Sequence, residues 1–114
     1  ISRKISLKKL ILKKGTGGGL QYHRKKNECG IIISGKLKVF YVNKSNKLIS
    51  KILKKGDVFH FPPRSIHKEL AITKCEIIEA STPHFNDRVR VEEKYGLAPK
   101  AGLKTTKISQ IKFL

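Results

Sequence analysis

The sequence predicts an all-β fold of antiparallel strands, arranged as a sandwich or a barrel. Short stretches rich in Ile, Val, Leu, Phe and Tyr recur along the chain, and turn signals such as "GTGGG", "NKSN" and "PPRS" separate them. No helical periodicity is present before residue 82. The expected strands are Ser6–Leu12, Leu20–His23, Cys29–Ser34, Leu37–Val42, Lys47–Leu53, Val58–Phe61, His67–Ile72 and Glu76–Ser81.

The composition changes after the last of these strands. From Thr82 the sequence reads "TPHFNDRVRVEEKYG", which predicts a loop and a short irregular segment laid across the barrel. The final stretch, "KISQIKFL", alternates and is expected to add a strand or to mediate dimerisation. A chain of 114 residues with 39% hydrophobic content has room for one core. We therefore expect a single domain over 1–114, with the barrel over about 6–81 and a C-terminal extension over 82–114.

The formal net charge of +18 favours anionic partners, although a general lysine bias would give the same excess. Nucleic acid is an unfavoured partner, because aromatic residues make up only 7% of the chain and are not interleaved with the basic ones. No apolar run has the length of a membrane span, so the expectation is a soluble, cytoplasmic protein without membrane contact. The two cysteines, Cys29 and Cys75, form no CxxC pair, and both are expected to be buried thiols.

The stretch "QYHRKKNECGIIISG" contains the residues that suggest chemistry. Gln21 and His23 are two positions apart, so on a strand their side chains leave the same face. After a turn, Glu28 can return its side chain to the same cavity, and His67 opens a later strand behind a Pro-Pro turn. Two imidazoles, a carboxylate and an amide oxygen suit a mixed nitrogen and oxygen site for a divalent metal. Each residue taken singly is more often structural, and the joint spacing is what favours the site.

The spacing of these residues resembles the two sequence motifs of the cupin superfamily. The first motif is matched by Gly15, Gln21, His23, Glu28 and Gly35, and the second by Gly56, Pro62 and His67. More narrowly, "QYHRKKNE", "FPPRSIH", "EIIEAS" and "NDRVRVEEKYG" resemble the cupin domain at the C-terminus of type II phosphomannose isomerases. That subgroup also has glutamine at the position of Gln21. The resemblance implies a jelly-roll barrel, also called a double-stranded β-helix.

The resemblance also implies a metal-dependent activity on a sugar phosphate or nucleotide sugar, similar to mannose-6-phosphate isomerase. Its ligands would be Gln21, His23, Glu28 and His67, with zinc as the first expectation and manganese, iron or nickel as alternatives. Glu79 is the candidate base, or else a charge on a strand face. The candidate phosphate contact is an arginine in the last matching segment, Arg90, whose alternative role is a salt bridge to Glu92 or Glu93.

Three positions depart from the motifs. Arg64 stands where the second motif normally has glycine, Ala71 where it often has asparagine, and Leu97 where the isomerases usually have arginine. The alternatives to an isomerase are therefore a non-catalytic module that binds sugar or metal, and another cupin metalloenzyme such as a dioxygenase.

Two expectations concern partners. A homodimer is expected, with the terminal segments "KISLKKLILKK" and "KISQIKFL" as candidate contacts. An anionic sugar or sugar phosphate is the expected ligand, because basic residues could surround the mouth of the cavity. Those residues are Arg24, Lys25, Lys26, Arg64, Arg88 and Arg90.

Overall fold

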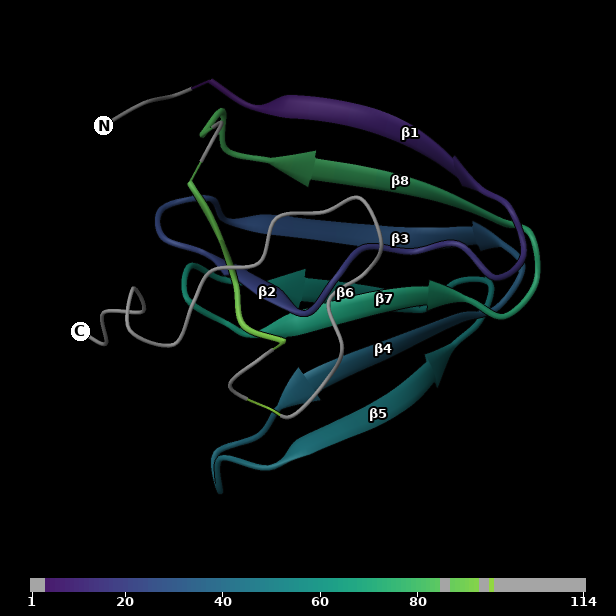
Figure 1. Ribbon diagram of the computed structural model, residues 1–114. Helices are drawn as coiled ribbons and strands as arrows, with labels where there is room; N and C mark the ends of the chain where they lie inside the picture. Colours follow the sequence, from purple (N-terminus) through teal and green to yellow (C-terminus); the bar gives the residue numbers. More distant parts are fainter. Residues whose placement is uncertain (1–3, 85–86, 93–94, 96–114) are drawn as a thin grey trace.

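The computed structural model describes residues 4–84, 87–92 and 95 (Figure 1). Two sheets of antiparallel strands face each other, one with the order β1-β8-β3-β6 and the other with the order β5-β4-β7-β2-β9. The strands are β1 (Ser6–Leu12), β2 (Gln21–His23), β3 (Glu28–Ser34), β4 (Leu37–Val42), β5 (Leu48–Leu53), β6 (Val58–Phe61), β7 (His67–Ala71), β8 (Cys75–Ser81) and β9 (Arg88–Arg90). No α-helix occurs among the described residues, so none there could cross a membrane.

The prediction of an all-β jelly-roll fold is confirmed, and each expected strand is present with its ends moved by no more than one residue. The segment after residue 81 differs from its prediction as a loop. Arg88–Arg90 forms β9, which pairs with β2 and makes the edge of the second sheet. The physical reason is the alternation in "RVRV", which places Val89 and Val91 on one face, where both are buried. The expected strand "KISQIKFL" lies outside the described residues.

The core lies between the sheets at one end of the barrel. Ile32, Leu37, Ala71 and Ile77 are at most 1% exposed there, and Phe59 and Phe61 pack with them. Full burial of one leucine, isoleucine or phenylalanine side chain stabilises the fold by roughly 1.5–3 kcal/mol. Toward the other end of the same strands the inward positions become polar, and this is where the candidate site lies.

A second cluster packs against the opposite face of β2. Tyr22 points away from its neighbours Gln21 and His23, because side chains alternate along a strand. It is buried with Leu20, Val89 and Val91. Strand β2 is therefore fixed on both faces, although it has only three residues.

The glycines of the two motifs have a conformational role. Gly15, Gly35 and Gly56 all have positive φ, at 83°, 83° and 89°. Glycine adopts such angles without the steric cost that a Cβ atom imposes. At Gly35 a Cβ would also lie 2.0 Å from the carbonyl oxygen of Lys74, so no other residue fits that turn.

The prediction that both cysteines are buried is wrong for one of them. Cys75 is fully buried, and its single S–H group lies within hydrogen-bond distance of two carbonyl oxygens, those of Lys36 at 2.9 Å and Thr73 at 3.2 Å. Cys29 is exposed on the outer face of β3. The reason is strand alternation, since the inward position goes to its neighbour Glu28.

Candidate metal centre

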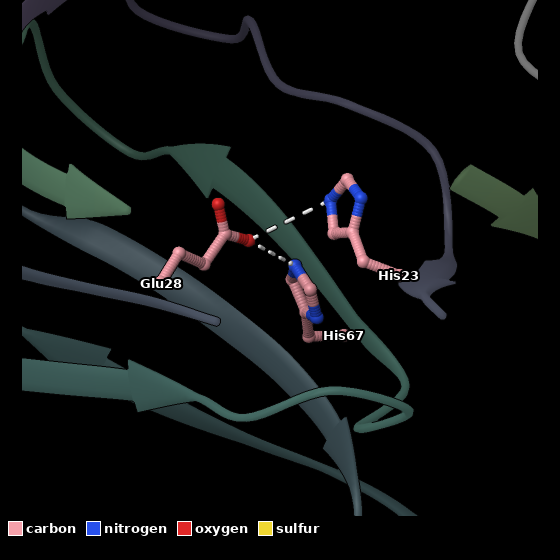
Figure 2. A group of neighbouring side chains, drawn as sticks. All are labelled: His23, Glu28 and His67. Carbon is pink, nitrogen blue, oxygen red and sulfur yellow. Dashed lines mark ion pairs between the residues drawn. The ribbon is translucent and has the colours of Figure 1, made fainter. Parts of the chain in front are cut away.

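Three side chains from both sheets meet inside the barrel (Figure 2). His23 ends β2, His67 begins β7, and Glu28 begins β3 in the facing sheet. The Oε1 atom of Glu28 lies 3.1 Å from Nε2 of His67 and 3.8 Å from Nε2 of His23. One ligand atom from each residue falls within a common span of 4.8 Å, and all three residues are buried. This separation suits a single ion bound by all three.

The pairing of the strands explains why these residues converge. Gln21 of β2 lies directly opposite His67 of β7, so their side chains leave the same face of the sheet as neighbours. His23 is two residues further along β2 and shares that face. The sequence spacing at 21 and 23 thus places both side chains toward the barrel interior, on the same side as His67.

Each imidazole is held by its second nitrogen. Nδ1 of His23 lies 2.9 Å from Oδ1 of Asp87, and Nδ1 of His67 lies 2.9 Å from the carbonyl oxygen of Ser65. The ring of His67 also stacks on Phe61, with centroids 3.9 Å apart and planes within 4°. Such outer contacts fix the orientation of a metal-binding histidine and the nitrogen that carries its hydrogen.

These contacts decide which atoms face the centre of the site. A carbonyl oxygen and a carboxylate can only accept, so both Nδ1 atoms donate their hydrogen. In a neutral imidazole the Nε2 atom then carries no hydrogen and has a free lone pair. In both histidines this atom faces the carboxylate of Glu28. Two acceptors 3.1 Å apart repel unless a proton or a cation lies between them. Gln21 adds a further lone pair, because its Oε1 is buried and has no hydrogen-bond partner among the described residues. The donor set therefore fits a divalent cation.

The surroundings of His23 and Glu28 shift the pKa values of both side chains. Burial lowers the pKa of His23 below its usual value, and this outweighs the opposite effects of Asp87 and Glu28. Burial alone would raise the pKa of Glu28, but a hydrogen bond from the protonated form of His67 and the positive charges of that imidazolium and of Lys26 lower it to about 2. Without a metal, a proton on Nε2 of His67 is thus what stabilises its close approach to Glu28. The carboxylate of Glu28 is therefore ionised near neutral pH and available as a ligand.

The site opens into a cavity of about 240 Å³ that contains two more carboxyl groups, Glu69 and Glu79. Burial, the charges of Glu28 and Glu69 and a hydrogen bond with Glu28 raise the pKa of Glu79 to about 7. Burial also raises the pKa of Glu69. A carboxyl group whose pKa is raised to near neutrality thus lies in the same cavity as the three candidate ligands.

Only some of the expected basic residues surround this cavity. Lys26 and Arg88 line it, together with Lys8 and Lys68, which were not anticipated. Of this basic group, Lys26 also forms an ion pair with Glu28, at 3.4 Å between Nζ and Oε2. The remaining members of the expected rim, Arg24, Lys25 and Arg64, do not line the cavity.

Arg90 is not among the residues that line the cavity, although its neighbour Gly19 is. Its side chain is buried, and Nη1 lies 3.7 Å from Oε1 of Glu92, which is the salt bridge considered above as the alternative to a phosphate contact. Both side chains pack against Gly19, where a Cβ atom would lie 2.0 Å from Glu92 Oε1. The structure thus describes Arg90 in its alternative role, as the partner of Glu92, and the phosphate contact stays a prediction.

Asp87 contacts the candidate site and was not predicted from the sequence. Its Oδ1 accepts from His23, and its Oδ2 accepts from the backbone nitrogens of Lys25 and Lys26 at 2.9 and 2.8 Å. Burial would raise the pKa of Asp87, but these three hydrogen bonds lower it to about 2. The only local signal was the polar pair "ND" immediately before "RVRV".

Most of the chain matches the profile of a known protein family. The family profile described as Cupin matches residues 2–100. Germin-like protein subfamily 1 member 6 of Arabidopsis thaliana is 31% identical over 77 residues, which cover 65% of this chain and 34% of that protein. Germin-like protein subfamily 2 member 1, from the same plant, is 44% identical over 45 residues, or 40% of this chain and 20% of that protein. The matches thus cover about a third or less of these curated relatives.

Solved structures share the fold at low sequence identity. A recombinant oxalate oxidase in complex with glycolate has a TM-score of 0.62 and 22% identity, over 76% of this chain and 46% of that one. Oxalate decarboxylase from Bacillus subtilis at pH 4.6 has a TM-score of 0.66 and 17% identity, over 82% and 28%. KdgF from Halomonas sp. has a TM-score of 0.64 and 18% identity, over 75% and 74%. The comparisons support the resemblance to cupins, while the narrower resemblance to phosphomannose isomerases is not shown by them.

Proposed function

Because this chain belongs to the cupin family, and because the lone pairs of His23, Glu28 and His67 face one another, we propose that it binds one divalent cation at this site. The observation that carries the proposal is the 3.1 Å approach of His67 Nε2 to Glu28 Oε1 while His67 Nδ1 donates to Ser65. Gln21 would be the fourth ligand, since its buried oxygen lacks a partner among the described residues.

The ligand chemistry narrows the choice of ion. Two imidazole nitrogens, one carboxylate and one amide oxygen form a borderline set, which suits zinc and also manganese, iron or nickel. Calcium and magnesium prefer sites whose ligands are all oxygen atoms, without imidazole. Zinc remains the first candidate, because it tolerates four mixed nitrogen and oxygen ligands in a compact arrangement.

The surroundings of the site favour a small anionic substrate. A bound cation would supply Lewis acidity that polarises a carbonyl or carboxylate oxygen. Lys8, Lys26 and Arg88 line the same cavity and can attract and orient a negative group. Glu79 lines the cavity as well and is the candidate for proton transfer, since its carboxyl group is buried beside Glu28.

Two substrate classes are supported by different observations. The motifs similar to those of type II phosphomannose isomerases favour isomerisation of a sugar phosphate. The structural similarity to an oxalate oxidase and an oxalate decarboxylase favours a small carboxylic acid. A module that binds metal and ligand without turnover is the third outcome.

The metal proposal is tested by stripping the protein with a chelator and titrating zinc and manganese by calorimetry. The wild type should bind one ion per chain, His67→Ala should bind none measurably, and Gln21→Leu should bind more weakly. His60→Ala is the matched control, because His60 is exposed on the outer face of β6 and bonds only Asn27 among the described residues. Equal binding by the wild type and His67→Ala would contradict the site.

Turnover then separates the substrate classes. The metal-loaded protein is assayed with mannose 6-phosphate, fructose 6-phosphate and oxalate. Product from either sugar phosphate supports an isomerase, and loss of oxalate supports the second class. Calorimetric binding without any product would favour the non-catalytic module.

We also propose that a second copy of the chain covers the outer face of the β1-β8-β3-β6 sheet. Leu7, Ile11 and Val58 are 72%, 56% and 70% exposed on that face. Lys9 and Glu76 are the charged residues of β1 and β8 on the same side, and a two-fold contact lets each pair with its opposite in the other copy. The wild type should be a dimer by light scattering at moderate salt, and Val58→Lys should shift it toward monomer. A wild-type monomer under these conditions would refute the contact.

A further inference from the structure

The residue Asp87 joins the strand β9 to the segment that carries two of the three proposed ligands. It immediately precedes β9 and lies 64 positions from His23 in the sequence. One carboxylate oxygen reaches the His23 ring, and the other accepts from two successive backbone nitrogens of the turn that follows His23. The backbone adds a further link, because the nitrogen of Arg24 donates to the carbonyl oxygen of Asp87 at 3.1 Å.

We propose that Asp87 is a positioning residue that sets both the tautomer of His23 and the path of the chain between His23 and Glu28. The inference rests on the proposed metal site and concerns how that site is built. Asp87 itself does not approach the centre, since its partners are Nδ1 of His23 and backbone nitrogens.

The tautomer follows from the chemistry of the carboxylate. An ionised Asp87 has no hydrogen to donate, so Nδ1 of His23 must carry the hydrogen of their shared bond. Nε2 is then free of hydrogen and faces Glu28 Oε1. The opposite tautomer would point an N–H group at the centre and remove His23 as a ligand.

The path of the chain follows from the second oxygen. Lys25 and Lys26 belong to the turn that separates His23 from Glu28. The backbone nitrogen of each residue donates a hydrogen bond to Oδ2 of Asp87. Lys26 in turn places its ammonium group 3.4 Å from Oε2 of Glu28. One carboxylate thus holds the backbone of the turn at Lys25 and Lys26, and the side chain of Lys26 contacts Glu28 at the end of the turn.

The substitution Asp87→Asn makes a sharp test, because it keeps the shape and removes one acceptor. The amide oxygen of asparagine must face the two backbone nitrogens, since its NH₂ group would meet two donors there. The NH₂ group then faces Nδ1 of His23 and requires it to accept. We expect His23 to change to the Nε2–H tautomer and the affinity for zinc to fall about 10- to 100-fold.

The experiment uses the full chain in two forms, metal-free and zinc-loaded. Nitrogen-15 NMR of the imidazoles reports the tautomer of His23 without any metal, calorimetry reports zinc affinity, and thermal unfolding reports the fold. Asp57→Asn is the matched control, because Asp57 accepts a backbone bond from Lys54 at 2.9 Å in a turn that does not line the site. This control should keep the His23 tautomer and zinc affinity of the wild type.

The outcomes separate this inference from the proposed function. A wild-type His23 in the Nε2–H tautomer would overturn the role of Asp87, whether or not Asp87→Asn folds. Zinc affinity of Asp87→Asn within twofold of the wild type would also overturn it. Wild-type protein that binds no metal, yet shows the Nδ1–H tautomer and its change in Asp87→Asn, would refute the metal site and retain the positioning of His23.

Discussion

Replacing Arg64 with glycine should stabilise the protein. Arg64 has φ of 70°, in the left-handed region, at the turn that leads into His67. In this region a residue with a Cβ atom is destabilised by roughly 1–2 kcal/mol. Glycine avoids that steric cost, but the greater freedom of its unfolded chain lowers the free energy of unfolding by about 0.5–1 kcal/mol. The midpoints of these two ranges differ by about 0.75 kcal/mol, which is the expected net gain in the free energy of unfolding and corresponds to an upward shift in Tm of roughly 2–5 °C. The backbone bond from Arg64 N to His23 O, at 2.6 Å, is kept by glycine.

Urea and thermal unfolding of Arg64→Gly measure this gain. Asn46→Gly is the matched control, because Asn46 has φ of 60°, and asparagine adopts this region at little cost. The control should change the free energy of unfolding by less than Arg64→Gly does. Zinc affinity should stay at the wild-type value, since Arg64 is exposed and does not line the cavity. A destabilised Arg64→Gly, or a gain no larger than that of Asn46→Gly, would refute the argument from backbone strain.

Two further predictions concern packing and thiol reactivity. Gly30→Ala should lower the free energy of unfolding in urea by about 1–3 kcal/mol, because the added Cβ atom would lie 2.4 Å from the ring of Phe59. Gly18→Ala is the control, because its Cβ atom meets no atom within 4 Å and the change should be neutral or slightly stabilising. Equal effects of the two substitutions would contradict this reasoning. A disulfide reagent should modify the exposed Cys29 in the folded protein and reach Cys75 only on unfolding. The reason is that Cys75 is fully buried and that burial raises the pKa of its thiol. Rapid reaction of both thiols in the native protein would contradict this prediction.

The fold could be predicted from sequence because its signals are local. Alternating apolar residues and glycine-rich turns define each strand without reference to the others. The convergence of His23, Glu28 and His67 was also accessible, since the distance along a strand fixes the face of each side chain. Their spacing in the two motifs supplied the long-range part that periodicity alone does not contain.

The missed features depend on contacts between distant strands. Asp87 meets His23 only because β9 pairs with β2, and three residues of alternation were too short a signal to predict that strand. Arg90 shows the same difficulty. Its position opposite Gln21 in the β2–β9 pair puts its side chain on the face of Gln21, but there Glu92, two residues along the chain, is its partner.

The division of the barrel interior lets the site and the core be changed separately. Along β8 the inward positions run from Cys75 and Ile77, which are buried in the apolar core, to Glu79 beside the triad. Along β7 they run in the opposite order, from His67 at the site to Ala71 in the core, because the strands are antiparallel across the fold. Both polar ends therefore coincide, and so do both apolar ends. A ligand can be removed at one end while the close-packed side chains at the other keep their contacts, so binding variants of this protein should remain folded.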